Sequence, residues 1–157
     1  MTQTKTWLVI GLAAVLAAAG CGKSGGGKRK VDPRFGTTAS GRPIQEKKLG
    51  DRLATFESEA MVDSVAWDSG QVVVRYRWKN NDKNKGLWIG LIELRAPGDV
   101  RVKWDLGGER GQSTEAAPGQ EASNVAVFPL PEETWKKGGV WLYIDGEGPD
   151  GYAIVAN

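Results

Sequence analysis

The second half of the chain alternates apolar and polar positions. Between residues 72 and 79, every second position is apolar, at Val72, Val74, Tyr76 and Trp78. The positions between them are Val73, Arg75, Arg77 and Lys79, and this alternation is the period of a strand with one buried face. Turns rich in Gly, Asn, Asp and Pro separate six further strand candidates. These lie at 64–67, 87–95, 99–106, 124–130, 140–145 and 152–155, and 131–136 predicts one helical turn. About seven short strands without a long amphipathic helix predict an all-β, antiparallel sandwich over residues 51–157.

The first twenty residues have a different pattern. Thirteen uncharged residues, 7–19, follow a short segment that carries one positive charge at Lys5. A bilayer-spanning helix needs about 20 apolar residues, so this stretch is short for a permanent membrane helix. Residues 1–20 therefore predict a signal peptide for export.

The end of this apolar run resembles the lipobox of bacterial lipoproteins. Ala18, Ala19, Gly20 and Cys21 carry the resemblance, and the departure is Ala18, where the family usually has a larger aliphatic residue. The resemblance implies diacylglycerol on the sulfur of Cys21 and attachment to the cell membrane through lipid. Ordinary cleavage after Ala19 is the alternative, and it would leave a free thiol in an oxidising compartment. Gly22 favours the outer membrane if the organism is Gram-negative, again by resemblance.

Residues 21–50 predict a lipidated, flexible, basic tether. This segment is rich in Gly, Ser, Lys and Arg, and residues 22–52 hold nine basic and three acidic residues, a net charge of +6. Residues 53–157 carry a net charge of −5. The tether is a solvated spacer in one interpretation. In the other, Lys28, Arg29 and Lys30 bind anionic lipid headgroups.

The order of the strands resembles the telokin-like and immunoglobulin-like domains of unknown function found in many bacterial lipoproteins. Residues 72–82, VVVRYRWKNND, resemble the strand before the family's first long hairpin. Phe128, Pro129 and Pro131, followed by a hairpin around 141–154, resemble its closing section. The resemblance implies an immunoglobulin-like β-sandwich that acts as an extracellular binding or scaffold module. Six tryptophans in the mature chain are more than that pattern requires.

Composition excludes most catalytic chemistry. The chain has no histidine, so a Ser-His-Asp triad, a Cys-His dyad and a histidine general base are excluded. Asp145, Glu147 and Asp150 lie in a glycine-rich turn that offers oxygen ligands for calcium, but their spacing differs from an EF-hand and a plain turn is favoured. We expect no enzyme, no catalytic residue, no metal and no cofactor. Nucleic acid is not an expected partner, because the folded part is acidic.

Two strand candidates are apolar on both faces and supply the candidate binding residues. Trp78 and Trp104 alternate in step with apolar neighbours, so core positions are predicted for both. Trp67 and Trp135 lie near strand or loop ends and fit either a core or a surface position. In 87–94 and 140–144 both parities are apolar, and a two-layer sandwich covers only one face of each sheet. The second face therefore needs another cover. The candidate partner-binding residues on it are Trp88, Ile92, Trp141 and Tyr143.

Three covers are possible for this aromatic face. The first is the protein's own chain, either residues 34–49 with Phe35, Ile44 and Leu49, or the loop with Trp135. The second is an envelope protein partner, since aromatic residues with few charges are typical of interface centres. The third is a glycan stacked on exposed tryptophans. These alternatives predict a non-enzymatic binding or envelope-maintenance module, with a carbohydrate-binding lipoprotein as the second hypothesis.

Overall fold

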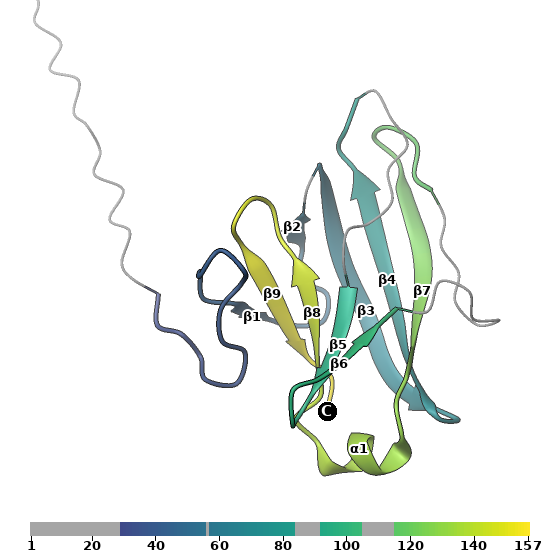
Figure 1. Ribbon diagram of the computed structural model, residues 1–157. Helices are drawn as coiled ribbons and strands as arrows, with labels where there is room; N and C mark the ends of the chain where they lie inside the picture. Colours follow the sequence, from purple (N-terminus) through teal and green to yellow (C-terminus); the bar gives the residue numbers. More distant parts are fainter. Residues whose placement is uncertain (1–28, 56, 84–91, 105–114) are drawn as a thin grey trace, which may run out of the picture.

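The protein folds into two facing β-sheets, as Figure 1 shows for a computed structural model that describes residues 29–55, 57–83, 92–104 and 115–157. One sheet has the strand order β1-β9-β8-β5-β6 and the other β2-β3-β4-β7. Neighbouring strands are antiparallel, except that β1 runs parallel to β9. The elements are β1 (Gln45–Lys47), β2 (Leu53–Thr55), β3 (Ser58–Asp68), β4 (Gln71–Asn80), β5 (Ile92–Ala96), β6 (Val100–Lys103), β7 (Glu121–Pro129), α1 (Glu132–Lys137), β8 (Trp141–Asp145) and β9 (Gly151–Val155).

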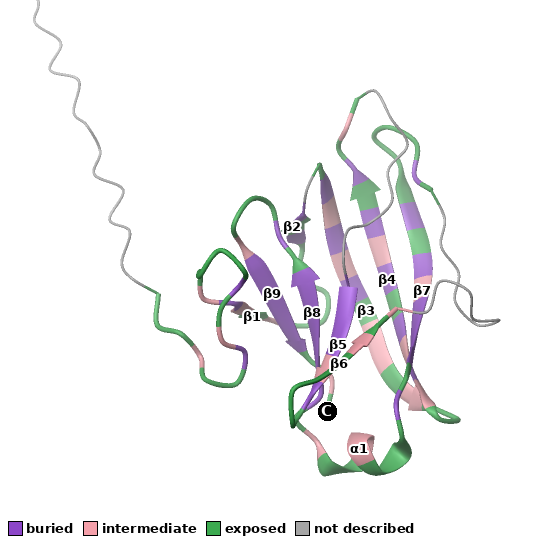
Figure 2. Ribbon diagram, viewed as in Figure 1, coloured by how far each residue is buried: buried purple, intermediate pink, exposed green. Residues whose placement is uncertain are grey.

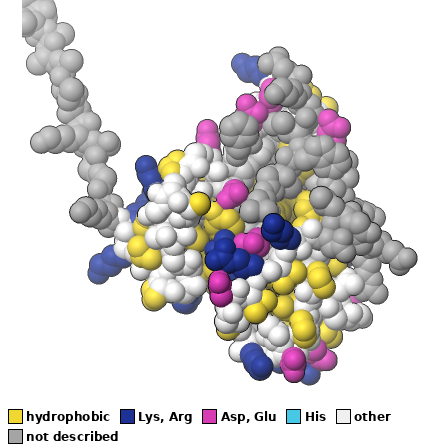
Figure 3. All heavy atoms as spheres, in the orientation of Figure 1, with side chains coloured by type: hydrophobic (Ala, Val, Ile, Leu, Met, Phe, Trp, Pro, Cys, Tyr) yellow, Lys and Arg dark blue, Asp and Glu magenta, His cyan; other side chains and the backbone are white. Residues whose placement is uncertain are grey.

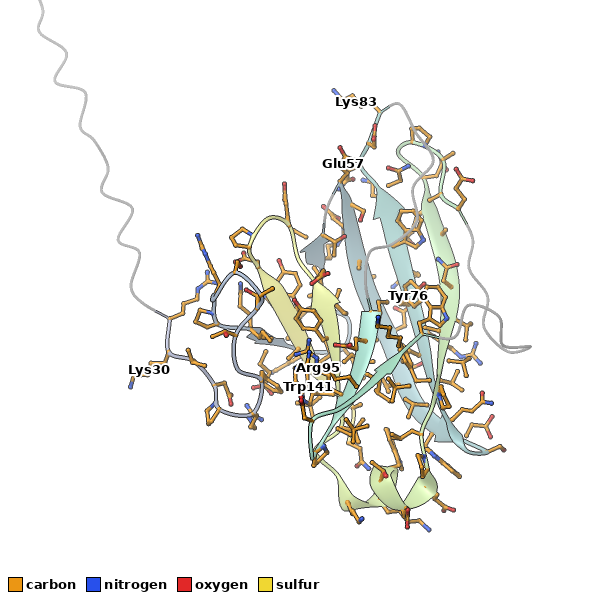
Figure 4. All side chains as sticks on the ribbon, viewed as in Figure 1. Lys30, Glu57, Tyr76, Lys83, Arg95 and Trp141 are labelled. Carbon is orange, nitrogen blue, oxygen red and sulfur yellow. The ribbon has the colours of Figure 1, made fainter. Side chains whose placement is uncertain are left out.

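The core lies between the two sheets and follows the alternation in the sequence. On β4, Val72, Val74, Tyr76 and Trp78 are at most 1% exposed, and residues between them face outward. Tyr76 points into the space between the sheets (Figure 4). The facing sheet adds Leu94, Leu142 and Ile154 to the same cluster, and neighbouring β7 adds Phe128. Each large apolar side chain buried in this way contributes about 1.5–3 kcal/mol of stability.

A bulge explains why the alternation in the sequence predicts only the second half of β3. The pairing of β3 with β4 shifts register between Val62 and Ser64. Ala60 and Val62 are buried before the shift, whereas Val65 and Trp67 pack against the core after it. The extra residue, Asp63, reverses the parity of the alternation, since a bulge places two residues opposite one.

The predicted all-β architecture with two sheets is confirmed. All seven predicted strands occur, although residues 87–91 and 105–106 of two of them lie outside the described residues. The predicted helical turn is α1. Trp104 packs against the core, with its ring edge-on to Tyr76 at 6.0 Å between centroids. Val100, which shares its parity, is 39% exposed because β6 is an edge strand of four residues.

The prediction of a flexible tether up to residue 50 is wrong for residues 32–47, which we call the strap. The strap turns at Asp32, whose carbonyl accepts the backbone N–H groups of Phe35 and Gly36. It then returns through a bridge between Thr37 and Pro43 and ends in β1 beside β9. Figure 1 shows it against the β9 edge of the sandwich. The prediction fails because β1 is three polar residues long and pairs with β9, whose register partners lie 107 residues later in the chain.

The described residues contain no helix that is long and apolar enough to span a membrane.

Candidate functional site

Strand β8 is buried on both faces, as the sequence predicts. Leu142 and Ile144 point into the core between the sheets, and Trp141 and Tyr143 point to the outer face of the five-stranded sheet. Figure 2 shows β8 as buried along almost its whole length, whereas β4 and β7 alternate between buried and exposed positions. The outer face of β8 therefore has a cover of its own.

The strap is that cover. Phe35 and Ile44 form a second hydrophobic cluster with Trp141, Tyr143 and Ala153. The ring of Phe35 lies edge-on to Trp141, with 5.0 Å between the centroids. Trp141 and Tyr143 are consequently 9% and 6% exposed. Of the three covers considered, the structure contains the protein's own chain.

Polar contacts hold the strap together and fasten it to the turn between β8 and β9. The guanidinium of Arg34 lies 2.7 Å from Asp32 and 2.6 Å from Glu46, and it covers the ring of Phe35 at 4.6 Å. In the middle of the strap, the hydroxyls of Thr38 and Ser40 each donate to the carbonyl of Pro149, in the turn between β8 and β9, at 3.1 Å. The strap is therefore fastened to the sheet by hydrogen bonds as well as by apolar contacts. Leu49, expected in the cover, is 48% exposed and does not contribute.

The structure describes three of the four candidate partner-binding residues and does not place these three on one face. Trp141 and Tyr143 share the outer face. Ile92 is 2% exposed and pairs with Ile144 in the core between the sheets. The prediction that Ile92 shares the outer face with Trp141 and Tyr143 is therefore wrong. The alternation in 87–94 does not show which residues point outward, because both faces of this segment are apolar. Trp88 and Cys21 lie outside the described residues.

An open groove lies beside the part of the outer face that the strap covers. Its volume is about 780 Å³, and its walls are strap residues 33–37 on one side and the hairpin between β5 and β6 on the other. The floor is one row of paired residues across four strands, Arg101, Arg95, Trp141 and Val155. Basic side chains lie at the centre of this face with hydrophobic side chains beside them (Figure 3). The groove thus combines positive charge with apolar surface.

The side chain of Arg95 is held by two rings and an ion pair. Its guanidinium carbon lies 4.1 Å from the ring centroid of Tyr143 and 5.0 Å from that of Trp141. Its Nε donates to Glu93 at 2.9 Å, and the two side chains are 17% and 8% exposed. In Figure 4 Arg95 and Trp141 lie together at the lower end of β8. Within the described part of the chain, the terminal nitrogens Nη1 and Nη2 of Arg95 make no hydrogen bond.

The tyrosine beneath the strap is held neutral. Burial, together with a hydrogen bond to Asp145, raises the pKa of Tyr143 to about 12, against the opposing effect of the Arg95 charge. A phenol with this pKa stays protonated near neutral pH and is a poor general base. Tyr143 therefore serves as apolar surface and as a support for Arg95.

The acidic turn considered for calcium is a closed hairpin. The backbone N–H of Gly146 donates to the carbonyl of Asp150 at 3.0 Å, and the N–H of Glu147 donates to Ala54 of the other sheet. Among the residues that the structure describes, no three Asp, Glu, Cys or His side chains come together as a metal site.

Sequence reasoning missed Arg95, Arg101 and Val155. A signal for Arg95 exists, since it shares strand parity with Glu93 in a segment that is otherwise apolar. Nothing in the sequence indicates that Arg101 pairs with Arg95, or that Val155 lies in the same row. That information comes from strand register.

Three comparisons, with protein-family models, with curated proteins and with solved structures, found no match to this chain.

Proposed function

We propose that this protein is an exported, lipid-anchored and non-enzymatic binding module, and that the groove beside the strap is its binding site. The observation that carries the proposal is the row from Arg101 to Val155, which places a constrained guanidinium next to an aromatic ring and an exposed aliphatic side chain. Ligand sites of this kind are concave, mostly apolar, and contain a few placed polar groups. The absence of histidine from the sequence supports a binding role over catalysis.

The anchor brings the groove close to a membrane. The strap begins at Asp32, about ten residues after Cys21. A fully extended chain spans at most about 3.6 Å for each residue, so this linker covers about 40 Å. With lipid on Cys21, the domain stays near the bilayer surface, and the most accessible partners are those of the envelope.

The strand order supports an immunoglobulin-like assignment as part of this proposal. Strands β3-β4-β7 are neighbours in the order of immunoglobulin strands A, B and E, and β9-β8-β5 are neighbours in the order G, F and C. Strands β1, β2 and β6 are then additions at the sheet edges. The strap ends in β1, and its residues 33–37 form one wall of the groove.

A carbohydrate-binding role has less support. Trp141 has Phe35 against it at 5.0 Å and the guanidinium of Arg95 over its ring at 5.0 Å. A sugar would need an open ring face for stacking, and this ring is 9% exposed.

Site-specific photocrosslinking in intact cells tests the binding role. A photoreactive phenylalanine replaces Val155, which is 43% exposed in the groove, and the control replaces Arg75 on the outer face of β4 in the other sheet. We expect a specific crosslinked product from position 155 and none from position 75. The same products from both positions, or no product from position 155, would contradict a protein partner at the groove.

Labelling tests the anchor separately. Cells grown with a radioactive fatty acid should incorporate label into the wild-type protein and none into the Cys21→Ser variant. Equal label in both proteins, or a wild-type protein that leaves the membrane without detergent, would reject lipid attachment at Cys21.

A further inference from the structure

Two arginines face each other across the β5–β6 pair. Arg95 and Arg101 are direct register partners, so their side chains lie on the same face of the sheet. Directly opposed residues have Cβ atoms about 5 Å apart, and like charges in this position destabilise a sheet. Arg101 contacts Asp99 at 3.2 Å, but that carboxylate is 85% exposed and water screens the pair. An anion in the groove would relieve this repulsion.

Arg95 is already arranged to receive such an anion. Glu93 engages only Nε, while the rings of Tyr143 and Trp141 fix the position of the guanidinium. The two terminal nitrogens keep their donors. A planar guanidinium presents parallel N–H groups that match the two oxygens of a carboxylate. Because this side chain is held in place before binding, little rotamer entropy remains to be lost.

Apolar surface lies immediately beside the charge. Val155 and Trp141 are register partners next to Arg95 in the floor, and Val100 lies in the hairpin wall. Four large hydrophobic residues are exposed among the described ones, and two of them, Val100 and Val155, line this groove. A ligand that fills the groove must therefore offer an apolar body next to its anionic group.

We propose that the groove binds an apolar carboxylate. The Nη1 and Nη2 groups of Arg95 donate to the two carboxylate oxygens, Arg101 adds favourable charge, and the apolar body lies against the exposed side chains of Val155 and Val100. The inference rests on the proposed function and names the class of its ligand. A groove of about 780 Å³ accommodates either a free acid or the last residues of a peptide, which share this chemistry.

Titration followed by NMR tests the ligand class. The protein is the isotope-labelled mature chain with Cys21→Ser, and the probes are phenylpropionate, acetyl-Ala-Ala-Phe with a free carboxylate, and phenylpropionamide. We expect saturable shifts of the Arg95 Nε–H and Trp141 indole N–H signals with one or both acids and none with the amide. Tighter binding of phenylpropionate indicates a free acid, and tighter binding of the peptide indicates a chain end.

Variants separate ligand binding from a purely structural role of Arg95. Arg95→Lys keeps the charge that Glu93 needs but loses the paired donors, so binding of the acids should weaken at least about tenfold while the backbone amide spectrum is retained. Arg101→Gln should weaken binding about threefold, because it removes a charge without leaving a buried partner. Arg75→Gln, the same change on the opposite sheet, should leave binding unchanged.

Three results would overturn the proposal. They are equal binding of amide and acid, displacement of the acids by equimolar inorganic phosphate, and no shift with either acid at about 10 mM. If the acids fail but position 155 still crosslinks to a partner, the binding role stands and only the ligand class falls. If the acids bind but no partner is crosslinked, the ligand class stands without a protein partner.

Discussion

The described residues form two hydrophobic clusters, one between the sheets and one under the strap, and the clusters differ in how many elements support them. The cluster between the sheets draws large side chains from strands of both sheets, including Trp78, Phe128 and Leu142, each under 2% exposed. The outer cluster has five members, and its cover consists of two strap residues, Phe35 and Ile44. Loss of one large side chain between the sheets therefore removes a small part of that cluster. Loss of Phe35 or Ile44 removes half of the cover of the outer cluster.

This difference predicts two levels of stability. Strands β3, β4 and β7 are linked by long ladders, and their opening requires global unfolding. The strap depends on a three-residue strand, a few hydrogen bonds and two apolar side chains. We expect it to open locally at a lower free energy than the sandwich. Since strap residues 33–37 form one wall of the groove, strap opening and groove shape are coupled.

The largest expected effect is in the cluster between the sheets. Phe128→Ala removes a fully buried ring from β7 and leaves a cavity, which should lower the free energy of unfolding by about 3–5 kcal/mol. Urea denaturation followed by circular dichroism measures it. A loss below about 1 kcal/mol would mean that Phe128 is not packed between the sheets.

The matched change under the strap should cost less. Phe35→Ala removes the same side chain from the outer cluster, and the expected loss is below about 3 kcal/mol because the strap can detach without unfolding the sheets. Hydrogen exchange locates the effect. The amide of Ile44, bonded to Gly36, should exchange faster, while amides of β4 remain protected. Equal acceleration in both regions would remove the distinction between the two clusters.

A smaller steric change tests how closely the strap lies on β9. A Cβ at Gly151 would come within 2.7 Å of the Thr38 methyl and 2.9 Å of a ring carbon of Tyr143. Gly151→Ala should therefore displace the strap at a cost of about 1 kcal/mol. Thr38→Ser in the same chain removes the opposing methyl but keeps the hydroxyl, so it should restore part of the loss. If Thr38→Ser restores no stability, the strain in Gly151→Ala does not come from the contact with the Thr38 methyl.

The smallest effect is on the response to pH. The pKa of Tyr143 in the folded protein is about 12, above the usual value of 10.0, so its contribution to stability is complete below pH 10 and is lost as the pH rises through 12. Burial also raises the pKa values of Tyr76 and Tyr152. Phenolate absorbance should therefore stay low at pH 10 in the folded protein. In Phe35→Ala, about one of the three tyrosines should ionise earlier, and an unchanged titration curve would show that the strap does not shield Tyr143.

Much of the sandwich was predictable from alternation, whereas the strap and the groove were not. Alternation identified β4 and both apolar faces of β8, and therefore the need for a second cover. It missed the first half of β3 because the bulge at Asp63 reverses parity, and it missed β1 because three polar residues carry no period. Phe35 and Ile44 were among the candidate covers as isolated apolar residues. The groove depends on register between distant strands, which no local pattern contains.

The most direct test of the account is the contact between the strap and the outer face of β8. A nuclear Overhauser experiment on the mature chain with Cys21→Ser should show cross-peaks between the ring protons of Phe35 and Trp141, whose centroids are 5.0 Å apart. Absence of those cross-peaks would contradict the account, because the aromatic face would then be open and the groove would lose its strap wall.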